Sequence, residues 1–139
     1  MNFLFSFLSS VGFAGLFNIP RKELIFTGIV GGTGYIAYRY IDMISSTSML
    51  GYFFGALIVG IFAEILAIIR KKPVTLYIIP GIIPLVPGYG LYYTMLKIIE
   101  KNYSGAAEVG FESFMVSLAI AAAIIIANGF GKHILRRKS

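Results

Sequence analysis

The sequence contains no cysteine among its 139 residues, so disulfide bonds, thiolate nucleophiles and cysteine-ligated metal sites are excluded. Its single histidine, His133, lies in a basic segment near the carboxyl end. The six acidic residues are scattered, and they form no Ser-His-Asp set, metal-ligand cluster or phosphate-binding loop with the rest of the chain. We therefore expect no enzyme activity, no cofactor and no bound metal.

Charge is also scarce. Only 13% of the residues are charged, whereas soluble domains carry about 25%, and 58% are hydrophobic. This composition predicts an all-α integral membrane protein. The net charge of +6 comes from short clusters of lysine and arginine between apolar runs. That pattern favours loops retained in the cytoplasm over a nucleic-acid surface.

Five apolar runs predict a single transmembrane domain over residues 1–139 with five helices. Their expected spans are about 3–17, 24–41, 48–69, 74–97 and 112–131. If the spans alternate, one side receives nine of the twelve basic residues, namely Arg21, Lys22, Arg70, Lys71, Lys72, Lys132, Arg136, Arg137 and Lys138. The positive-inside rule then places the amino terminus outside and the carboxyl terminus in the cytoplasm.

Glycines recur at four-residue spacing in the second and third runs. Gly28 with Gly32, and Gly51 with Gly55, predict helix faces that neighbouring helices approach closely. Residues 32–37 also match the spacing of a dinucleotide-binding loop. We reject that function because the segment lies in an apolar helix and no acidic residue follows at the required distance.

The fourth run contains the segment IPGIIPLVPGYG, residues 79–90, which we expect to break the helix. Pro80, Pro84 and Pro87 each remove a backbone N–H and clash with the carbonyl four residues earlier. Inside a membrane, the freed carbonyls of Leu76, Pro80 and Ile83 need new partners. Transporters use such broken helices to bind solutes. A kinked helix repaired by its neighbours is the alternative.

The position of this break predicts a substrate site formed by Pro80, Gly81, Pro84, Pro87 and Gly88. These residues lie eight to sixteen positions beyond Lys72, or roughly 12–24 Å into a core of about 30 Å. A helix that restarts after Pro87 would direct its positive amino-terminal end to this depth. We expect that end to favour a carboxylate and the loosened carbonyls to favour an ammonium group.

Glu64 is the one charged residue within the third run. It lies six residues before Arg70, so roughly 9 Å inside the cytoplasmic end of the predicted helix. A carboxylate at that depth is costly unless it faces protein or water, which makes Glu64 a candidate proton carrier. A structural ion pair with Arg70 or Lys71 is the alternative. Asn18 and Asn128 are predicted at a similar depth, where all three would share a cytoplasmic vestibule, although each asparagine alone is also typical of a helix end.

Three motifs resemble the threonine/serine exporter family. They are Phe17-Asn18-x-Pro20-Arg21, Ala63-Glu64-Ile65-Leu66-Ala67, and the proline-glycine motif from Pro80 to Gly88. The chain is most similar to the short membrane subunit that corresponds to the carboxyl-terminal half of the fused exporters. It departs from the family pattern at Ile68 and Ile69, where a basic residue is expected soon after the glutamate.

The resemblance implies a subunit of a secondary exporter in the bacterial inner membrane. Its cargo would be threonine and serine, or a small dicarboxylate such as succinate, and its partner a larger multi-span subunit. We expect Asn18 and the proline-glycine motif to form the substrate site, and Glu64 to couple or gate transport from the cytoplasmic side. Two alternatives remain open: a passive channel formed by self-association, and a structural subunit whose partner holds the whole site.

Overall fold

The computed structural model describes residues 2–135, which form helices and turns without a strand. Arg136, Arg137 and Lys138 of the predicted basic tail lie outside the described residues. The longer helices are α1 (Asn2–Leu16), α2 (Leu24–Ile44), α3 (Ser48–Arg70), α5 (Gly88–Ile99) and α6 (Tyr103–Phe130). Shorter elements are η1 (Arg21–Glu23), α4 (Thr75–Gly81), η2 (Ile83–Leu85) and a π-helical turn at Gly131–Leu135. The all-helical prediction is confirmed.

The described helices include two or three candidate membrane spans. Among the described residues, Ser48–Arg70 and Tyr103–His133 are long and apolar enough to cross a membrane, and the bent pair Thr75–Leu85 with Gly88–Ile99 would make a third span. The first helix is apolar but short. Glycine, threonine and tyrosine lower the hydropathy of α2. The five predicted spans therefore stay a prediction.

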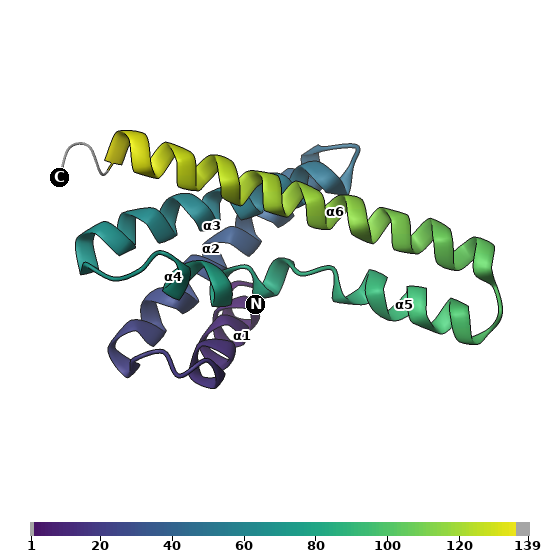
Figure 1. The fold of residues 1–139 in the computed structure, drawn as a ribbon, viewed down its shortest axis with the longest axis horizontal. Coiled ribbons are helices and arrows are strands. Elements are labelled where there is room, and N and C mark those ends of the chain that lie inside the picture. Colours follow the sequence, from purple (N-terminus) through teal and green to yellow (C-terminus); the bar gives the residue numbers. More distant parts are fainter. Residues whose placement is uncertain (1, 136–139) are drawn as a thin grey trace.

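The helices α1 to α4 form a packed body, and α6 runs along one side of it (Figure 1). Helix α2 packs between α1 and α3, and α3 packs between α2 and α6. Helix α5 packs mainly on α6, and this hairpin extends away from the rest of the body (Figure 1). Helix α6 begins at Tyr103, nine residues before the predicted span at 112, and those extra residues accompany α5.

Glycines set the close approach of the central helices, as predicted. A methyl group built on Gly32 would lie 2.5 Å from the ring of Phe3 in α1, and one on Gly28 would lie 2.7 Å from Phe7. At the α2–α3 crossing, a methyl group on Gly55 would lie 2.9 Å from the carbonyl oxygen of Gly34. Because these gaps are too small for a side chain, the two backbones are nearly in contact.

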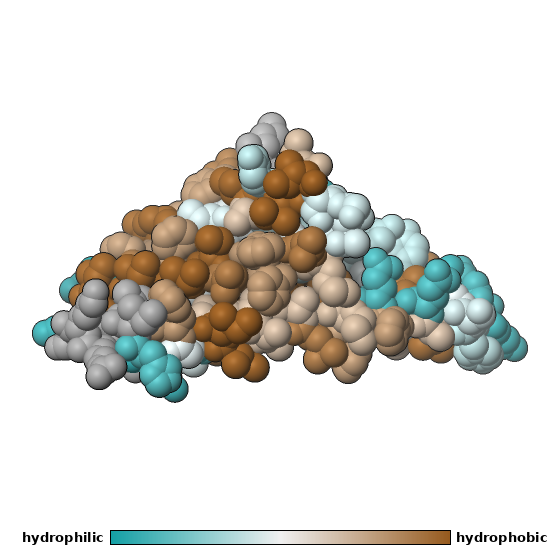
Figure 2. Space-filling model, turned by 90° about the horizontal axis from the view of Figure 1, so that it is seen from above, coloured by the Kyte–Doolittle hydropathy of each residue, from teal (hydrophilic) through white to brown (hydrophobic). Residues whose placement is uncertain are grey.

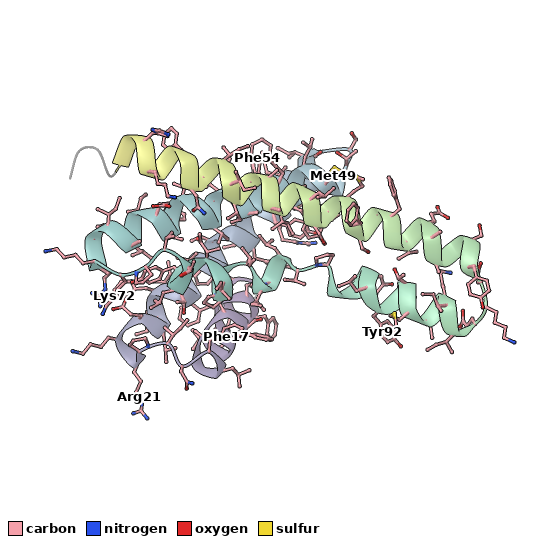
Figure 3. The ribbon with its side chains drawn as sticks, in the orientation of Figure 1. Phe17, Arg21, Met49, Phe54, Lys72 and Tyr92 are labelled. Atoms are coloured by element: carbon pink, nitrogen blue, oxygen red, sulfur yellow. The ribbon has the colours of Figure 1, made fainter. Side chains whose placement is uncertain are left out.

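The surface is largely hydrophobic. Figure 2 shows hydrophobic residues over most of the visible face, with hydrophilic residues gathered toward its ends. Arg21 and Lys72 project from the same end of the body (Figure 3). This arrangement suits a helical membrane protein whose polar ends meet water and whose middle meets lipid or another protein.

Candidate functional site: the broken helix

The predicted break is present, and we call α4, η2 and α5 together the broken helix. Its two parts, Thr75–Leu85 and Gly88–Ile99, meet at an angle of 55°. Pro80 lies inside the last turn of α4. Pro87 directly precedes α5 and has a non-helical ψ of 59°. Each proline removes a donor from the helical ladder, so the chain cannot continue as one helix.

Tight turns replace part of the lost hydrogen bonding. The N–H of Val86 donates to the carbonyl of Ile83 at 3.2 Å, and the N–H of Ile82 donates to the carbonyl of Ile78 at 3.0 Å. The N–H of Gly88 donates to Val86 at 2.8 Å. Of the three carbonyls expected to lose donors, that of Ile83 therefore gains a local one. The short 3-10 turn η2 brings the N–H of Val86 to that oxygen, three residues away.

Gly81 lies deep in the body. A methyl group built on it would lie 2.9 Å from Cγ1 of Val30 in α2 and 3.1 Å from Cγ1 of Val59 in α3. Val59 is the middle residue of the 23-residue helix α3, so Gly81 lies level with the middle of that helix. The carbonyl oxygen of Gly81 lies 3.3 Å from the position that a methyl group on Gly31 would take. The end of α4 is thus held between α2 and α3.

Ser10 of α1 lies beside Gly31, at the same contact as the carbonyl of Gly81. It is completely buried, and its hydroxyl lies directly against Gly31. Its Oγ has no hydrogen-bond partner among the described residues. A buried hydroxyl without a partner is unusual, because leaving it unsatisfied costs about 1–3 kcal/mol. This burial of Ser10 could not be predicted from the sequence, since serine in an apolar helix commonly bonds its own backbone.

The predicted site residues do not line one common cavity. Pro84 borders a cavity of about 260 Å³ together with Phe5, Ser6, Ser9 and Tyr35. Pro87 and Gly88 border a larger cavity of about 690 Å³ between the start of α3, the start of α5 and α6. Its polar lining includes Ser46, Thr47, Ser48, Glu112 and Ser113. Pro80 and Gly81 instead lie in the packed interior.

Asn18 lies apart from both of these cavities. It ends the first helix with a left-handed φ of 59° and is exposed. It borders a third cavity of about 380 Å³, lined also by Phe17, Ile19, Pro20, Pro73, Thr75, Leu76 and Ile79. This cavity adjoins the start of the broken helix, so Asn18 remains near the predicted site although it is far along the chain from it.

Glu64 is completely buried at the contact between α3 and the segment after α6. A methyl group built on Gly131 would lie 2.6 Å from its carboxyl carbon. Asn128, one turn earlier than Gly131, has a buried Oδ1 without a hydrogen-bond partner in the described part of the chain. Glu64 and Asn128 thus belong to the α3–α6 contact, whereas Asn18 lies beside α4. The structure does not bring the three predicted residues to one cavity.

Arg70 forms its salt bridge with Glu23, so the suggested pairing of Arg70 with Glu64 is wrong. Its Nη2 donates to Oε1 of Glu23 at 2.7 Å, and its Nε lies 3.1 Å from Oε2. The hydroxyl of Tyr77 in α4 donates to Oε2 of the same carboxylate at 2.6 Å. The guanidinium also lies over the ring of Phe26, 4.4 Å from its centre. Arg70 is the last residue of α3 and Glu23 directly precedes α2, so this cluster joins three elements.

The Glu23 carboxylate is only 2% exposed and is held in its charged form. The hydrogen bond from Arg70 lowers the pKa of Glu23 below its ordinary value of 4.5, against the opposing effect of burial. In sequence, Glu23 follows two basic residues in a short connection, which is typical of a solvated charge. Its partners lie 47 and 54 positions away, so local pattern could not identify them.

A family model described as "Threonine/Serine exporter, ThrE" matches residues 2–129. The chain belongs to the threonine/serine exporter family. This membership fits a transporter with a small-molecule substrate in a lipid bilayer, and it confirms the resemblance carried by the three motifs.

The chain is also similar to an uncharacterized protein of Haemophilus influenzae. The two are 26% identical over 128 residues, which cover 92% of this chain and 43% of that protein. This exporter-family chain therefore spans less than half the length of that relative. No solved structure matches it.

Proposed function

We propose that this chain is a subunit of a secondary exporter in the bacterial inner membrane, and that the broken helix lines its solute path. The cargo would be threonine, serine or a small carboxylate such as succinate. The observation that carries this proposal is the position of the break. Gly81 lies level with the middle of α3, and the residues that follow it border two cavities, one at Pro84 and the other at Pro87 and Gly88.

The start of α5 suits a solute carboxylate. Gly88, Tyr89 and Gly90 at its start border the cavity of about 690 Å³, and of their N–H groups that of Gly88 already donates to the carbonyl of Val86. A helix amino terminus carries partial positive charge and free donors, so it favours an anion. Hydroxyls of Ser46 and Ser48 border the same space and can accept from an ammonium group.

A larger partner subunit is part of the proposal. The relative in Haemophilus influenzae has more than half of its length outside the match, so the family's chains include proteins with room for a second half. None of the residues of α5 is buried, and it exposes Tyr89, Leu91, Tyr92, Met95 and Ile99. A partner subunit would cover this hairpin and close the open cavities, making the solute path a shared one.

We also propose the amino terminus outside and the carboxyl terminus in the cytoplasm. The Glu23–Arg70 salt bridge supports a shared side for the basic residues of η1 and those at the end of α3. Arg21, Lys22, Arg70, Lys71 and Lys72 are thereby gathered at one end, as the positive-inside rule expects of a cytoplasmic face. Glu64 would couple export to protons from that same half of α3.

The test is export of labelled threonine, serine and succinate by cells that express this chain with and without a candidate larger subunit. Gly88→Leu is the decisive variant. No atom lies within 4 Å of a methyl group built on Gly88, so a leucine side chain has open space at its base and would narrow the cavity that Gly88 borders. Gly12→Leu is the matched control, because Gly12 also has open space around it but lies on α1.

We expect Gly88→Leu to assemble normally and to lose export, and Gly12→Leu to retain both. Normal export by Gly88→Leu would contradict a solute path through this cavity. Export that is non-saturating and independent of the proton gradient would instead support a passive channel. Loss of partner abundance on deletion of this chain, without any effect of Gly88→Leu, would support a structural subunit.

A further inference from the structure

The buried cluster of Glu23, Arg70 and Tyr77 lies outside every residue assigned to transport above. Both carboxylate oxygens of Glu23 are used, one mainly by Arg70 and the other by Arg70 and Tyr77. A buried ion pair is a poor source of stability, because desolvation of the charges offsets most of their attraction. The best-attested use of such a pair is to fix one arrangement of the elements that it joins.

The element that most needs fixing is α4. It has only seven residues, too few to be stable as an isolated helix, and a proline ends it on each side at positions 73 and 84. Its position therefore depends on contacts with α2 and α3. Within residues 2–135, Tyr77 is the one α4 side chain that hydrogen-bonds to another element, and it is completely buried.

Tyr77 and Gly81 lie four residues apart, so they share one face of α4. The hydroxyl of Tyr77 is bound at the end of the body where α2 begins and α3 ends. One turn further, Gly81 is seated between Val30 and Val59. The hydrogen bond to Glu23 thus restrains both the rotation of α4 about its axis and the depth at which Gly81 enters between α2 and α3.

We propose that Glu23 is a positioning residue for transport. Through Tyr77 it holds α4 in the closed arrangement in which Gly81 is packed between α2 and α3, and solute passage requires that this hydrogen bond be released. The inference rests on the proposed function for its link to transport. The arrangement of α4 itself can be tested without any cargo.

The first test is thiol accessibility, which the absence of native cysteine makes unambiguous. Ile82 directly follows α4 and packs against the core, so Ile82→Cys provides a thiol at the break. A membrane-impermeant maleimide is applied to membranes from the side of Arg21 and Lys72. We expect Tyr77→Phe to raise the labelling rate about tenfold or more, the factor for loss of one hydrogen bond to a charged group.

The controls separate release of α4 from general loosening. Tyr40→Phe changes an exposed tyrosine of α2 and should leave the labelling rate unchanged. Glu23→Gln should raise it as Tyr77→Phe does, and the two changes together should add little, because they remove the same contact. An unchanged labelling rate in Tyr77→Phe, or full additivity with Glu23→Gln, would overturn the inference.

The second test is the kinetics of labelled threonine export in the assembled protein. Easier release predicts a changed maximal rate per assembled complex in Tyr77→Phe, whereas a purely structural role changes only the amount of complex. An unchanged rate per complex overturns the role in transport. If the wild-type complex exports no threonine, the proposed cargo fails, and the labelling experiment still decides whether Glu23 positions α4. If Tyr77→Phe lowers yield, both measurements are made on the fraction that assembles.

Discussion

Alanine at Gly81 tests whether the break is packed as tightly as its surroundings indicate. The added methyl group would lie 2.9 Å from Cγ1 of Val30 and 3.1 Å from Cγ1 of Val59, whereas carbon atoms pack best at about 3.5–4.0 Å. Both valines are completely buried and β-branched, so neither side chain can turn away freely. The helices must separate by several tenths of an ångström.

Such overpacking typically costs about 1–3 kcal/mol, and alanine recovers up to about 1 kcal/mol through its higher helix propensity. We therefore expect Gly81→Ala to lower the free energy of unfolding by about 1–2 kcal/mol. Gly88→Ala is the matched control in the same motif. A methyl group there meets no atom within 4 Å, so this variant should be as stable as the wild type or slightly more stable.

The assay is thermal unfolding of the protein in detergent, with wild type, Gly81→Ala and Gly88→Ala compared under identical conditions. A lower midpoint for Gly81→Ala alone is the expected result. Equal midpoints for the two variants would refute the packing of α4 between Val30 and Val59. A lower midpoint for Gly88→Ala alone would show that the tight contact lies at the other end of the break.

Three further predictions concern other parts of the body. Gly60→Ala should weaken the α3–α6 contact and lower the unfolding midpoint, because its methyl group would lie 2.5 Å from Cβ of Ala127. Gly129→Ala in α6 should leave the midpoint unchanged, because a methyl group there meets no atom within 4 Å. Glu64→Gln should reduce proton-driven export without reducing the amount of protein, and unchanged export by Glu64→Gln would contradict a coupling role. Because the pKa of Glu23 is lowered in the folded protein, its carboxylate stabilises the fold above the ordinary value of 4.5, and this stabilisation is lost as pH falls through the lower folded-state pKa. Glu23→Gln should remove this loss of stability at acid pH, as measured by unfolding at a series of pH values.

The break in the fourth run could be predicted because it is a local effect. Three prolines within eight residues forbid a continuous helix whatever surrounds them, and the structure breaks there. The packing role of Gly28 and Gly32 could also be predicted, since four-residue spacing puts both glycines on one face of any helix. Phe7 and Phe3 occupy that face.

The arrangement of charged groups could not be predicted in the same way. Arg70 is the basic residue nearest to Glu64 in sequence. It nevertheless pairs with Glu23, because the loop before α2 folds back onto the end of α3. The pairing depends on tertiary packing that neither segment encodes alone. Asn18 borders a cavity beside α4, whereas the buried Oδ1 of Asn128 belongs to α6, and the common vestibule stays a prediction.

The most direct test of the central claim is export of labelled threonine and succinate from proteoliposomes that contain the purified assembly. We predict saturable export that depends on the proton gradient, requires both this chain and a larger subunit, and is lost in Gly88→Leu. Saturable export by the larger subunit alone, or undiminished export with Gly88→Leu, would contradict the claim that the broken helix lines the solute path.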